Sequence, residues 1–218
     1  MATCRCAYGG ALQLSEQHKN KLTGIDLADS VTIDFHKLFY QPISCGAFLV
    51  KDQESFQYLS LHADYLNPEE DDEAGIPNLV NKSIQTTRRF DAFKLYVSLQ
   101  AIGIQTFAEM VEGTMSLAKD VATRLKEEHF EVVNPDPQIN AVVFRYVSNG
   151  ENIDLINASI RDQLLNEGIA VIARTKICGQ TYLKLTLLNP LTTMEDINFI
   201  IEQMKKITQE TMKEEIYV

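Results

Sequence analysis

The segment Asn134-Pro135-Asp136-Pro137 constrains the fold of this 218-residue chain more than any other feature. Each proline lacks a backbone donor and biases the residue before it away from the helical conformation, so a helix cannot continue through the segment. The chain is long enough for one large or two small domains. We therefore predict a domain boundary here, with one domain over residues 1–133 and a second over residues 134–218.

The second predicted domain has the order strand, helix, strand, strand, helix. Apolar spacing predicts strands at 139–147, 169–173 and 182–188 and a helix at 153–166. A last helix follows Thr192-Thr193-Met194-Glu195, which has the spacing of a capping box. Its predicted buried stripe is Ile197, Ile200, Ile201, Met204 and Ile207. This order is typical of a small α+β domain with helices on one face of an antiparallel sheet.

The first predicted domain contains two short strands, a long loop and two helices. Alternating apolar residues predict half-buried strands at 30–35 and 46–50. The stretch from 58 to 87, which includes five acids at 69–73, is predicted to be a loop, and loops of this length are often lids or binding loops. Apolar residues at helical spacing predict two core-facing helices, one beginning near Phe90 and one near Phe107.

Charge and composition exclude several classes of function. The net charge of -10 and the absence of a long Lys and Arg run argue against a nucleic-acid partner. No apolar run approaches the roughly 20 residues that cross a bilayer, and the N-terminus has no apolar signal core, so we expect no membrane partner and a cytoplasmic location. The C-x-C at 4–6 lacks the second half of a zinc site, so we expect no metal and four free thiols: Cys4, Cys6, Cys45 and Cys178.

The strand predicted at 30–35 ends directly on His36 and Lys37. By spacing alone, this lysine is either a surface residue at a strand end or an amine that forms a Schiff base with a carbonyl compound. A Schiff-base lysine has to be partly neutral, which burial or cationic neighbours favour. The spacing of the residues leaves both interpretations open.

Five segments carry a specific combination of motifs: AYGGAL at 7–12, DSVTIDFHKLFYQPISCGAFLV at 29–50, HADYLNP at 62–68, GIPNLVNKSIQTTRRFDAFKLYVSL at 75–99 and LKLTLLNPLTT at 183–193. Together they resemble the pyridoxal-phosphate-dependent group II decarboxylases, and among these the bacterial L-2,4-diaminobutyrate decarboxylase type. The resemblance covers essentially the whole chain. It implies an α/β fold, the C-terminal part of a fold-type-I enzyme, with part of the large domain and a small α+β domain.

The resemblance implies that four residues bind pyridoxal 5'-phosphate and that an amino acid is the substrate. Lys37 matches the lysine that holds this cofactor as an internal aldimine, and His36 and Asp34 match positions near its phosphate. Ala7 matches the small residue that packs on one face of the pyridine ring. The segment from about 77 to 88 matches a mobile loop that closes over the neighbouring subunit's site in the family's homodimer.

The chain departs from the family pattern in two main ways. Arg5 stands where the family has an aspartate that pairs with the pyridine nitrogen, and a cation there disfavours the protonated ring. Family members also carry phosphate-binding residues and a stacking histidine upstream of the region matched here. We therefore expect an incomplete chain whose first residues arise from a shifted reading frame.

Three functions remain open from the sequence. The first is an amino acid decarboxylase that is active only when another chain supplies the missing half or in a full-length form. The second is a catalytically inactive remnant of such an enzyme. The third is another fold-type-I enzyme, such as an aminotransferase, although residues 182–186 lack the arginine that aminotransferases usually place in the small domain.

Overall fold

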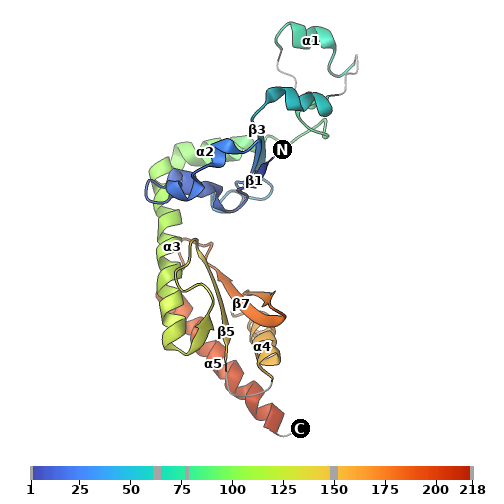
Figure 1. The fold of residues 1–218 in the computed structure, drawn as a ribbon. Helices are drawn as coiled ribbons and strands as arrows, with labels where there is room; N and C mark the ends of the chain where they lie inside the picture. The colour runs from blue at the N-terminus through green and yellow to red at the C-terminus, as the bar shows by residue number, and fades with distance from the viewer. Residues whose placement is uncertain (1, 61–64, 77–78, 148–151, 217–218) are drawn as a thin grey trace. The chain divides into compact units, whose positions relative to one another are not determined.

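The computed structural model describes residues 2–60, 65–76, 79–147 and 152–216 (Figure 1). The chain divides into two compact units, Met1–Ala108 and Glu109–Val218. The helix α3 (Ile104–Glu127) begins in the first unit and continues into the second, where its buried residues pack against the core. The division between the two compact units therefore lies within α3, upstream of Pro135. The predicted boundary at 133/134 concerns the large and small domains of the family fold, and it stays a prediction.

The first unit contains a three-stranded sheet in the order β1-β2-β3. β2 pairs in parallel with β1 and antiparallel with β3, so Thr32 lies opposite Arg5 on one side and Phe48 on the other. The strand predicted at 46–50 is confirmed, and the strand predicted at 30–35 ends one residue earlier, at Asp34. β1 is too short to show an alternating pattern in the sequence. The bounds are β1 Thr3–Arg5, β2 Ser30–Asp34 and β3 Gly46–Val50.

The stretch from 58 to 87 is more ordered than predicted. The five acids form the short helix α1 (Glu69–Glu73), which follows Pro68, and acidic side chains are favourable in the first turn of a helix. The buried amides of Asn67 and Asn81 are hydrogen bonded at 2.6 Å across this stretch. The described residues of the first unit also form five 3-10 helices: η1 Gly9–Leu14, η2 Lys19–Leu22, η3 Ile25–Leu27, η4 Gln53–Tyr58 and η5 Val80–Lys82.

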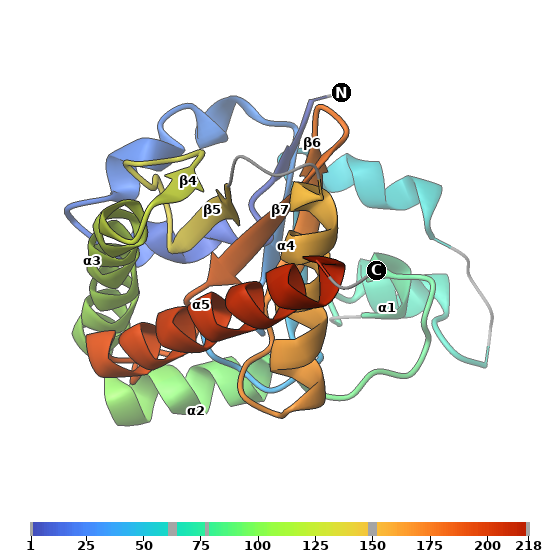
Figure 2. The same cartoon turned by 90° about the horizontal axis from the view of Figure 1, so that it is seen from below.

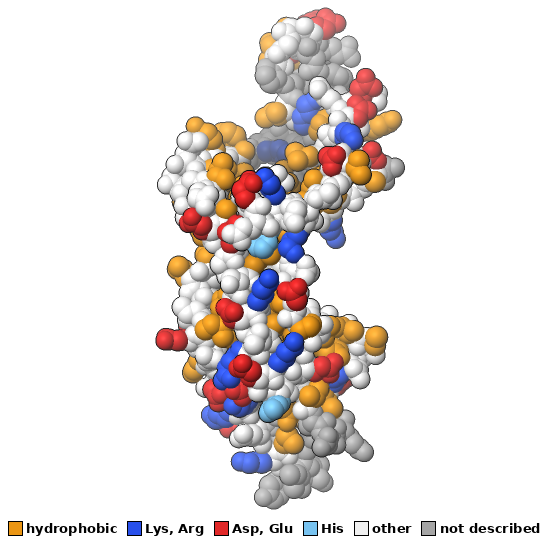
Figure 3. Space-filling model, turned by 60° about the vertical axis from the view of Figure 1, so that its left-hand side comes forward, with side chains coloured by type: hydrophobic (Ala, Val, Ile, Leu, Met, Phe, Trp, Pro, Cys, Tyr) orange, Lys and Arg blue, Asp and Glu red, His pale blue; other side chains and the backbone are white. Residues whose placement is uncertain are grey.

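The two helices predicted from apolar spacing differ in their packing. In α3, Phe107, Val111 and Val121 are fully buried, which confirms a core-facing helix. α2 (Ala92–Ile102) has no buried residue, so the prediction of a core-facing helix is wrong there. Phe93, Tyr96, Val97 and Ile102 of α2 are exposed, as is Phe90 before it, and hydrophobic side chains are visible on the surface of the first unit in Figure 3. No described residue of the first unit covers this face of α2.

The second unit contains a four-stranded antiparallel sheet in the order β4-β5-β7-β6. The helix predicted at 153–166 is confirmed as α4. The strand predicted at 169–173 is wrong, because the amides of Ile169 and Ala170 donate to the Leu164 carbonyl at the end of α4, and the strand begins only at Ala173. The bounds are β4 Phe130–Val132, β5 Ala141–Tyr146, α4 Ile153–Asn166, β6 Ala173–Ile177, β7 Gln180–Thr186 and α5 Met194–Ile216.

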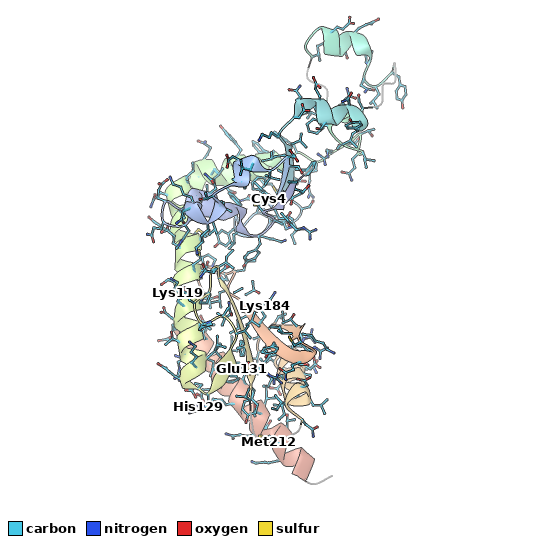
Figure 4. All side chains as sticks on the ribbon, viewed as in Figure 1. Cys4, Lys119, His129, Glu131, Lys184 and Met212 are labelled. Atoms are coloured by element: carbon cyan, nitrogen blue, oxygen red, sulfur yellow. The ribbon has the colours of Figure 1, made fainter. Side chains whose placement is uncertain are left out.

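One face of this sheet is covered by helices, as predicted. The helices α3, α4 and α5 lie against this sheet (Figure 2). Their buried residues form a single core with the inward side chains of β5 and β7. The predicted stripe of α5 is buried at Ile197, Ile201, Met204 and Ile207. The opposite face carries polar side chains, among them Glu131 and Lys184 (Figure 4).

No helix among the described residues is both long and apolar enough to cross a membrane.

Candidate active site

The candidate site lies at the end of β2, where three consecutive backbone contacts hold the His36-Lys37 segment. The amide of His36 donates to the Cys45 carbonyl at 3.1 Å, which extends the β2–β3 pairing beyond Asp34. The amide of Lys37 then donates to the Asp34 carbonyl at 3.2 Å, and Tyr40 closes the turn by donating to the Lys37 carbonyl at 2.9 Å. Lys37 therefore stands on a turn just after the strand, in a fixed backbone position.

Buried apolar side chains anchor this turn on both sides of the lysine. Leu38 and Phe39, which follow Lys37, are buried. The rings of Phe35 and Phe39 meet edge to face with centroids 5.0 Å apart. Burial of large apolar side chains contributes about 1.5–3 kcal/mol each, so the neighbours of Lys37 hold the turn against the unit while its own side chain reaches the surface.

A cluster of charged side chains surrounds Asp34. The Lys37 Nζ atom lies 2.7 Å from the Asp34 Oδ2 atom, and the His36 Nε2 atom lies 3.8 Å from the same oxygen. The hydrogen bond from Lys37 is the largest cause that lowers the pKa of the Asp34 carboxyl, and the charges of Lys37, His36 and Arg5 lower it further. Asp34 is therefore ionised at neutral pH.

The backbone of Cys45, just before β3, sets the orientation of the His36 ring. The Nδ1 atom of His36 lies 2.7 Å from the Cys45 carbonyl oxygen and 3.3 Å from the Cys45 amide nitrogen, so it donates to the carbonyl in one tautomer and accepts from the amide in the other. Cys45 is itself buried, and its Sγ donates to the Asp91 carbonyl at 3.4 Å. Sequence reasoning missed this role of Cys45, because a backbone carbonyl leaves no signal in the residue type.

Ala7 joins the cluster through the AYGG turn that follows β1. The amide of Asp34 donates to the Ala7 carbonyl at 3.2 Å. A Cβ atom at Gly10 would lie 3.1 Å from Ile33, which is tighter than ordinary packing, so a glycine fits this close approach to β2. The structure thus brings together the four residues singled out by the sequence: Ala7, Asp34, His36 and Lys37.

Arg5 also lies within electrostatic range of this cluster, because β1 pairs in parallel with β2. It flanks Asp34 from the neighbouring strand and contributes to the lowered pKa of that carboxyl. Cys4, labelled in Figure 4, and Cys6 flank Arg5, with their Sγ atoms 3.1 Å apart. In the part of the chain that the structure describes, no three His, Cys, Asp or Glu side chains gather as a metal site would require.

The predicted mobile loop falls partly outside the described residues. Positions 77 and 78 are among those that the structure does not describe. The following part contains η5 (Val80–Lys82), whose Lys82 ammonium lies 4.9 Å from the centroid of the Phe56 ring. Closure of this segment over a neighbouring subunit stays a prediction.

The cluster suits the attachment of an aldehyde cofactor. A primary amine on an anchored turn can bond to an aldehyde, and the Lys37 side chain is 36% exposed, so the amine is within reach of a ligand. The neighbouring Ala7 adds little bulk beside it. Arg5 does not fit the protonated ring nitrogen of pyridoxal phosphate, since both would be cationic. The described residues therefore fit the attached end of that cofactor and leave its ring nitrogen without an anion at position 5.

Comparison with known protein families and curated proteins gives a consistent result. Residues 5–147 match the family model described as the pyridoxal-dependent decarboxylase conserved domain. The L-2,4-diaminobutyrate decarboxylase of Acinetobacter baumannii is 41% identical over 201 residues, which cover 91% of this chain and 39% of that protein. The aromatic-L-amino-acid decarboxylase of Bacillus atrophaeus is 30% identical over 213 residues, which cover 94% of this chain and 44% of that protein. The chain thus spans less than half the length of these relatives.

Solved structures share the fold. The glutamate decarboxylase domain of diaminobutyrate-pyruvate transaminase and L-2,4-diaminobutyrate decarboxylase from Vibrio parahaemolyticus is 34% identical, with a TM-score of 0.77 over 94% of this chain and 39% of that one. An Oryza sativa TDC structure with PLP and tryptamine has a TM-score of 0.87 at 23% identity, over 96% of this chain and 44% of that one. The α/β fold expected from the sequence is confirmed.

Proposed function

Because the chain belongs to the pyridoxal-dependent decarboxylase family, we propose that it is the cofactor-attaching part of an amino acid decarboxylase of the L-2,4-diaminobutyrate type. Lys37 would hold pyridoxal 5'-phosphate through its Nζ atom. The observation that carries this proposal is the anchored turn, which holds Lys37 at the strand end with its side chain 36% exposed. The cytoplasm is the proposed location, and an amino acid is the proposed substrate.

The residues of the chain bind and orient the cofactor, while the cofactor carries the difficult chemistry. When bound, pyridoxal phosphate supplies an electron sink for the electron pair that CO₂ leaves on the substrate. Lys37 provides the point of attachment, and its turn fixes where that point lies. His36 is held by the Cys45 carbonyl and presents the edge of its ring toward Asp34. Ala7 leaves space for a flat ring beside the strand end.

Exposed apolar surface in the first unit supports a partner that completes the site. Phe48 and Leu49 are successive residues of β3 and point to opposite faces of the sheet, yet they are 51% and 52% exposed. Apolar residues on both faces are typical of α/β sheets with two covered faces. We propose that a polypeptide equivalent to the remaining part of the longer relatives covers β3 and α2, and that the assembly is a homodimer.

A catalytically inactive remnant is the second candidate, and Arg5 is the observation that favours it. In this form the chain attaches the cofactor weakly or not at all, because a cation at position 5 opposes protonation of the ring nitrogen. The electron sink depends on that proton. The two candidates share the fold and differ in whether CO₂ is released.

Trapping the cofactor on the purified chain tests both candidates. The chain is incubated with pyridoxal 5'-phosphate, reduced with borohydride and mapped by peptide mass spectrometry. We expect the label on Lys37 in the natural chain and its loss in Lys37→Ala. Lys94→Ala is the matched control, because Lys94 forms an ion pair of the same spacing and length with Asp91 in the same unit, and it should leave the label in place.

The outcomes separate the two candidates. Label on Lys37 with release of CO₂ from L-2,4-diaminobutyrate supports the decarboxylase. Weak or absent label on Lys37 without CO₂, even after a polypeptide carrying the N-terminal part of a relative is added, supports the remnant. Label spread over the surface lysines, or unchanged in Lys37→Ala, rules out cofactor attachment at this site.

A further inference from the structure

We propose that Asp34 is a positioning residue that receives the Lys37 ammonium whenever this lysine is not bonded to the cofactor. The inference rests on the proposed function, because only a lysine that leaves the cofactor during turnover needs such a partner. In the proposed enzyme, the amine of an amino acid substrate would take the place of the lysine on the cofactor, and the Lys37 side chain would then be free. The released side chain is long and flexible, and a nearby carboxylate keeps its amine close to the site.

The geometry of the unbonded lysine supports this role. Nζ lies 2.7 Å from Oδ2 of Asp34, in a turn whose backbone is closed by the Lys37 amide and the Asp34 carbonyl. This backbone hydrogen bond therefore holds the Cα atoms of the two residues close together, whether or not their side chains are in contact. The side chains are 36% and 29% exposed, so the pair forms at the surface and can open without disturbing the buried core.

The surroundings of Asp34 keep its carboxylate available as an anion. His36 faces Oδ2 from the same segment, at 3.8 Å, and Arg5 contributes its positive charge from β1. Gly46 of β3 lies on the other side of Asp34 and adds no side chain there. A Cβ atom at this position would lie 3.5 Å from the Asp34 Oδ1 atom and 3.2 Å from the Ile33 carbonyl oxygen. The hydrogen bond from Lys37 is the largest cause that holds the pKa of Asp34 below its ordinary value, and the positive charge of Arg5 acts in the same direction.

This role differs from the one that the family resemblance implies for Asp34. A carboxylate beside the cofactor phosphate would place two anions side by side, which is unfavourable. Beside the lysine ammonium, the same carboxylate forms a charge-assisted hydrogen bond. The contacts of Asp34 are therefore those of a partner for Lys37.

The chain contains a matched pair that serves as a control. Lys94 Nζ lies 2.7 Å from Asp91 Oδ1 at the same spacing of three residues, with side chains 26% and 25% exposed. This pair lies in the same unit, at the start of α2, where Asp91 Oδ1 also lies 2.6 Å from the Arg89 Nε atom. Neither the Lys94 nor the Asp91 side chain belongs to the proposed site. Removal of either carboxylate therefore perturbs one lysine and spares the other.

Lysine reactivity in the full chain measures the first part of the proposal without any cofactor. The chain is treated with formaldehyde and borohydride, and methylation of each lysine is followed by peptide mass spectrometry. We expect Asp34→Asn to raise the rate at Lys37 about two- to fivefold relative to Lys94, as for loss of a partly exposed ion pair. Asp91→Asn should raise the rate at Lys94 instead, and Asp34→Glu should restore the slow rate at Lys37.

Release of the lysine from the cofactor measures the second part. Asp34 stabilises only the free lysine, so its loss favours the bonded form. In chain loaded with pyridoxal phosphate, Asp34→Asn should therefore require about two- to fivefold more L-2,4-diaminobutyrate to free half of Lys37, read as the borohydride-trapped fraction on that residue. Asp91→Asn should need the same amount as the natural chain.

An unchanged rate at Lys37 in Asp34→Asn, or an unchanged release, would overturn the proposal. If Asp34→Asn fails to fold, rates rise at every lysine, and the natural Asp34 is then examined by carboxyl NMR. Lys37→Gln should raise the pKa of Asp34, while Lys94→Gln should not, and no change in Lys37→Gln also overturns the proposal. Methylation and NMR need no cofactor, so a failure to trap pyridoxal phosphate is a separate result that concerns the proposed function.

Discussion

At the residue scale, two carboxylates of this chain collect cations that come from different elements. Asp34 is flanked by Arg5 of β1 and by Lys37. Glu128, which follows α3, lies 2.6 Å from the Arg124 guanidinium of the same helix and 2.8 Å from the Lys205 ammonium of α5. The hydrogen bond from Lys205 is the largest cause that lowers the pKa of Glu128. Glu128 thus ties two helices of the second unit together.

We expect Glu128→Gln to lower the stability of the chain in a pH-dependent way. The pKa of Glu128 is depressed in the folded protein, so its contribution is present above the pKa of an unfolded glutamate, roughly 4.3, and is lost as the pH falls through the folded value. Urea unfolding at neutral pH should show a lower midpoint in the variant than in the natural chain, and the gap should close in acid.

Glu127→Gln is the matched control for this measurement. Glu127 is the preceding residue, 61% exposed, and its oxygen lies 3.4 Å from Arg124. It should change the midpoint less than Glu128→Gln at neutral pH. A gap between Glu128→Gln and the natural chain that persists unchanged at low pH would contradict the assignment of this stability to an ionised Glu128.

At the scale of the element, the start of α5 shows how a local signal can be correct in kind and displaced in position. The sequence predicts a capping box from the spacing of Thr192 and Glu195. The structure forms the box one residue later, where the Thr193 amide and hydroxyl donate to Asp196 Oδ2 at 2.8 Å and the Asp196 amide donates to the Thr193 hydroxyl at 3.3 Å. Both spacings satisfy the motif, and the packing of the α5 stripe decides between them.

We expect Thr193→Ala to destabilise the chain by about 1 kcal/mol, because it removes the side chain that accepts from the first turn of α5. Thr192→Ala, which changes the neighbouring threonine, should have a much smaller effect. Thermal and urea unfolding of the two variants compare them directly. Equal losses in both variants would show that the cap does not depend on Thr193.

Other elements mark where local patterns succeed and fail. α4 agrees with its predicted range of 153–166, because its apolar spacing is strong and it is followed by the Glu167-Gly168 turn. β6 does not, because the residues after α4 are apolar enough for a strand while their amides are used to end the helix. The apolar spacing of α2 predicts the helix correctly, but the prediction that this helix is buried is wrong. Burial depends on a second surface that packs against the helix, and the described residues of the first unit do not supply one.

At the scale of the whole molecule, the two units differ in how completely their apolar residues are buried. The core of the second unit draws on three helices and on the strands of its sheet. In the first unit, the buried residues gather near the AYGG turn and the turn that holds Lys37, while β3 and α2 keep large apolar side chains exposed. Local stability follows the density of buried apolar contacts.

We therefore expect amide hydrogen exchange to be slower in the second unit. Peptides from β5 and β7 should be more protected than peptides from β2 and β3, when each rate is corrected for its intrinsic value. Mass spectrometry of the exchanging full chain makes this comparison within one sample. Protection of β3 equal to that of β7 would contradict the expectation and would indicate that β3 and α2 are already covered in solution.

The sequence by itself determined the strand that ends beside Lys37, the main helices of the second unit and the motifs that mark the family, because periodicity and motif spacing are encoded in neighbouring residues. Only the tertiary structure decided that Lys37 meets Asp34, that the Cys45 carbonyl orients His36, and that Arg5 adds its charge to the same carboxylate. The contacts of Arg5 and Cys45 depend on the register between strands, and a pattern within one segment carries no information about that register. The contact of Lys37 with Asp34 is local, and it depends on the turn after β2 that brings the two side chains together.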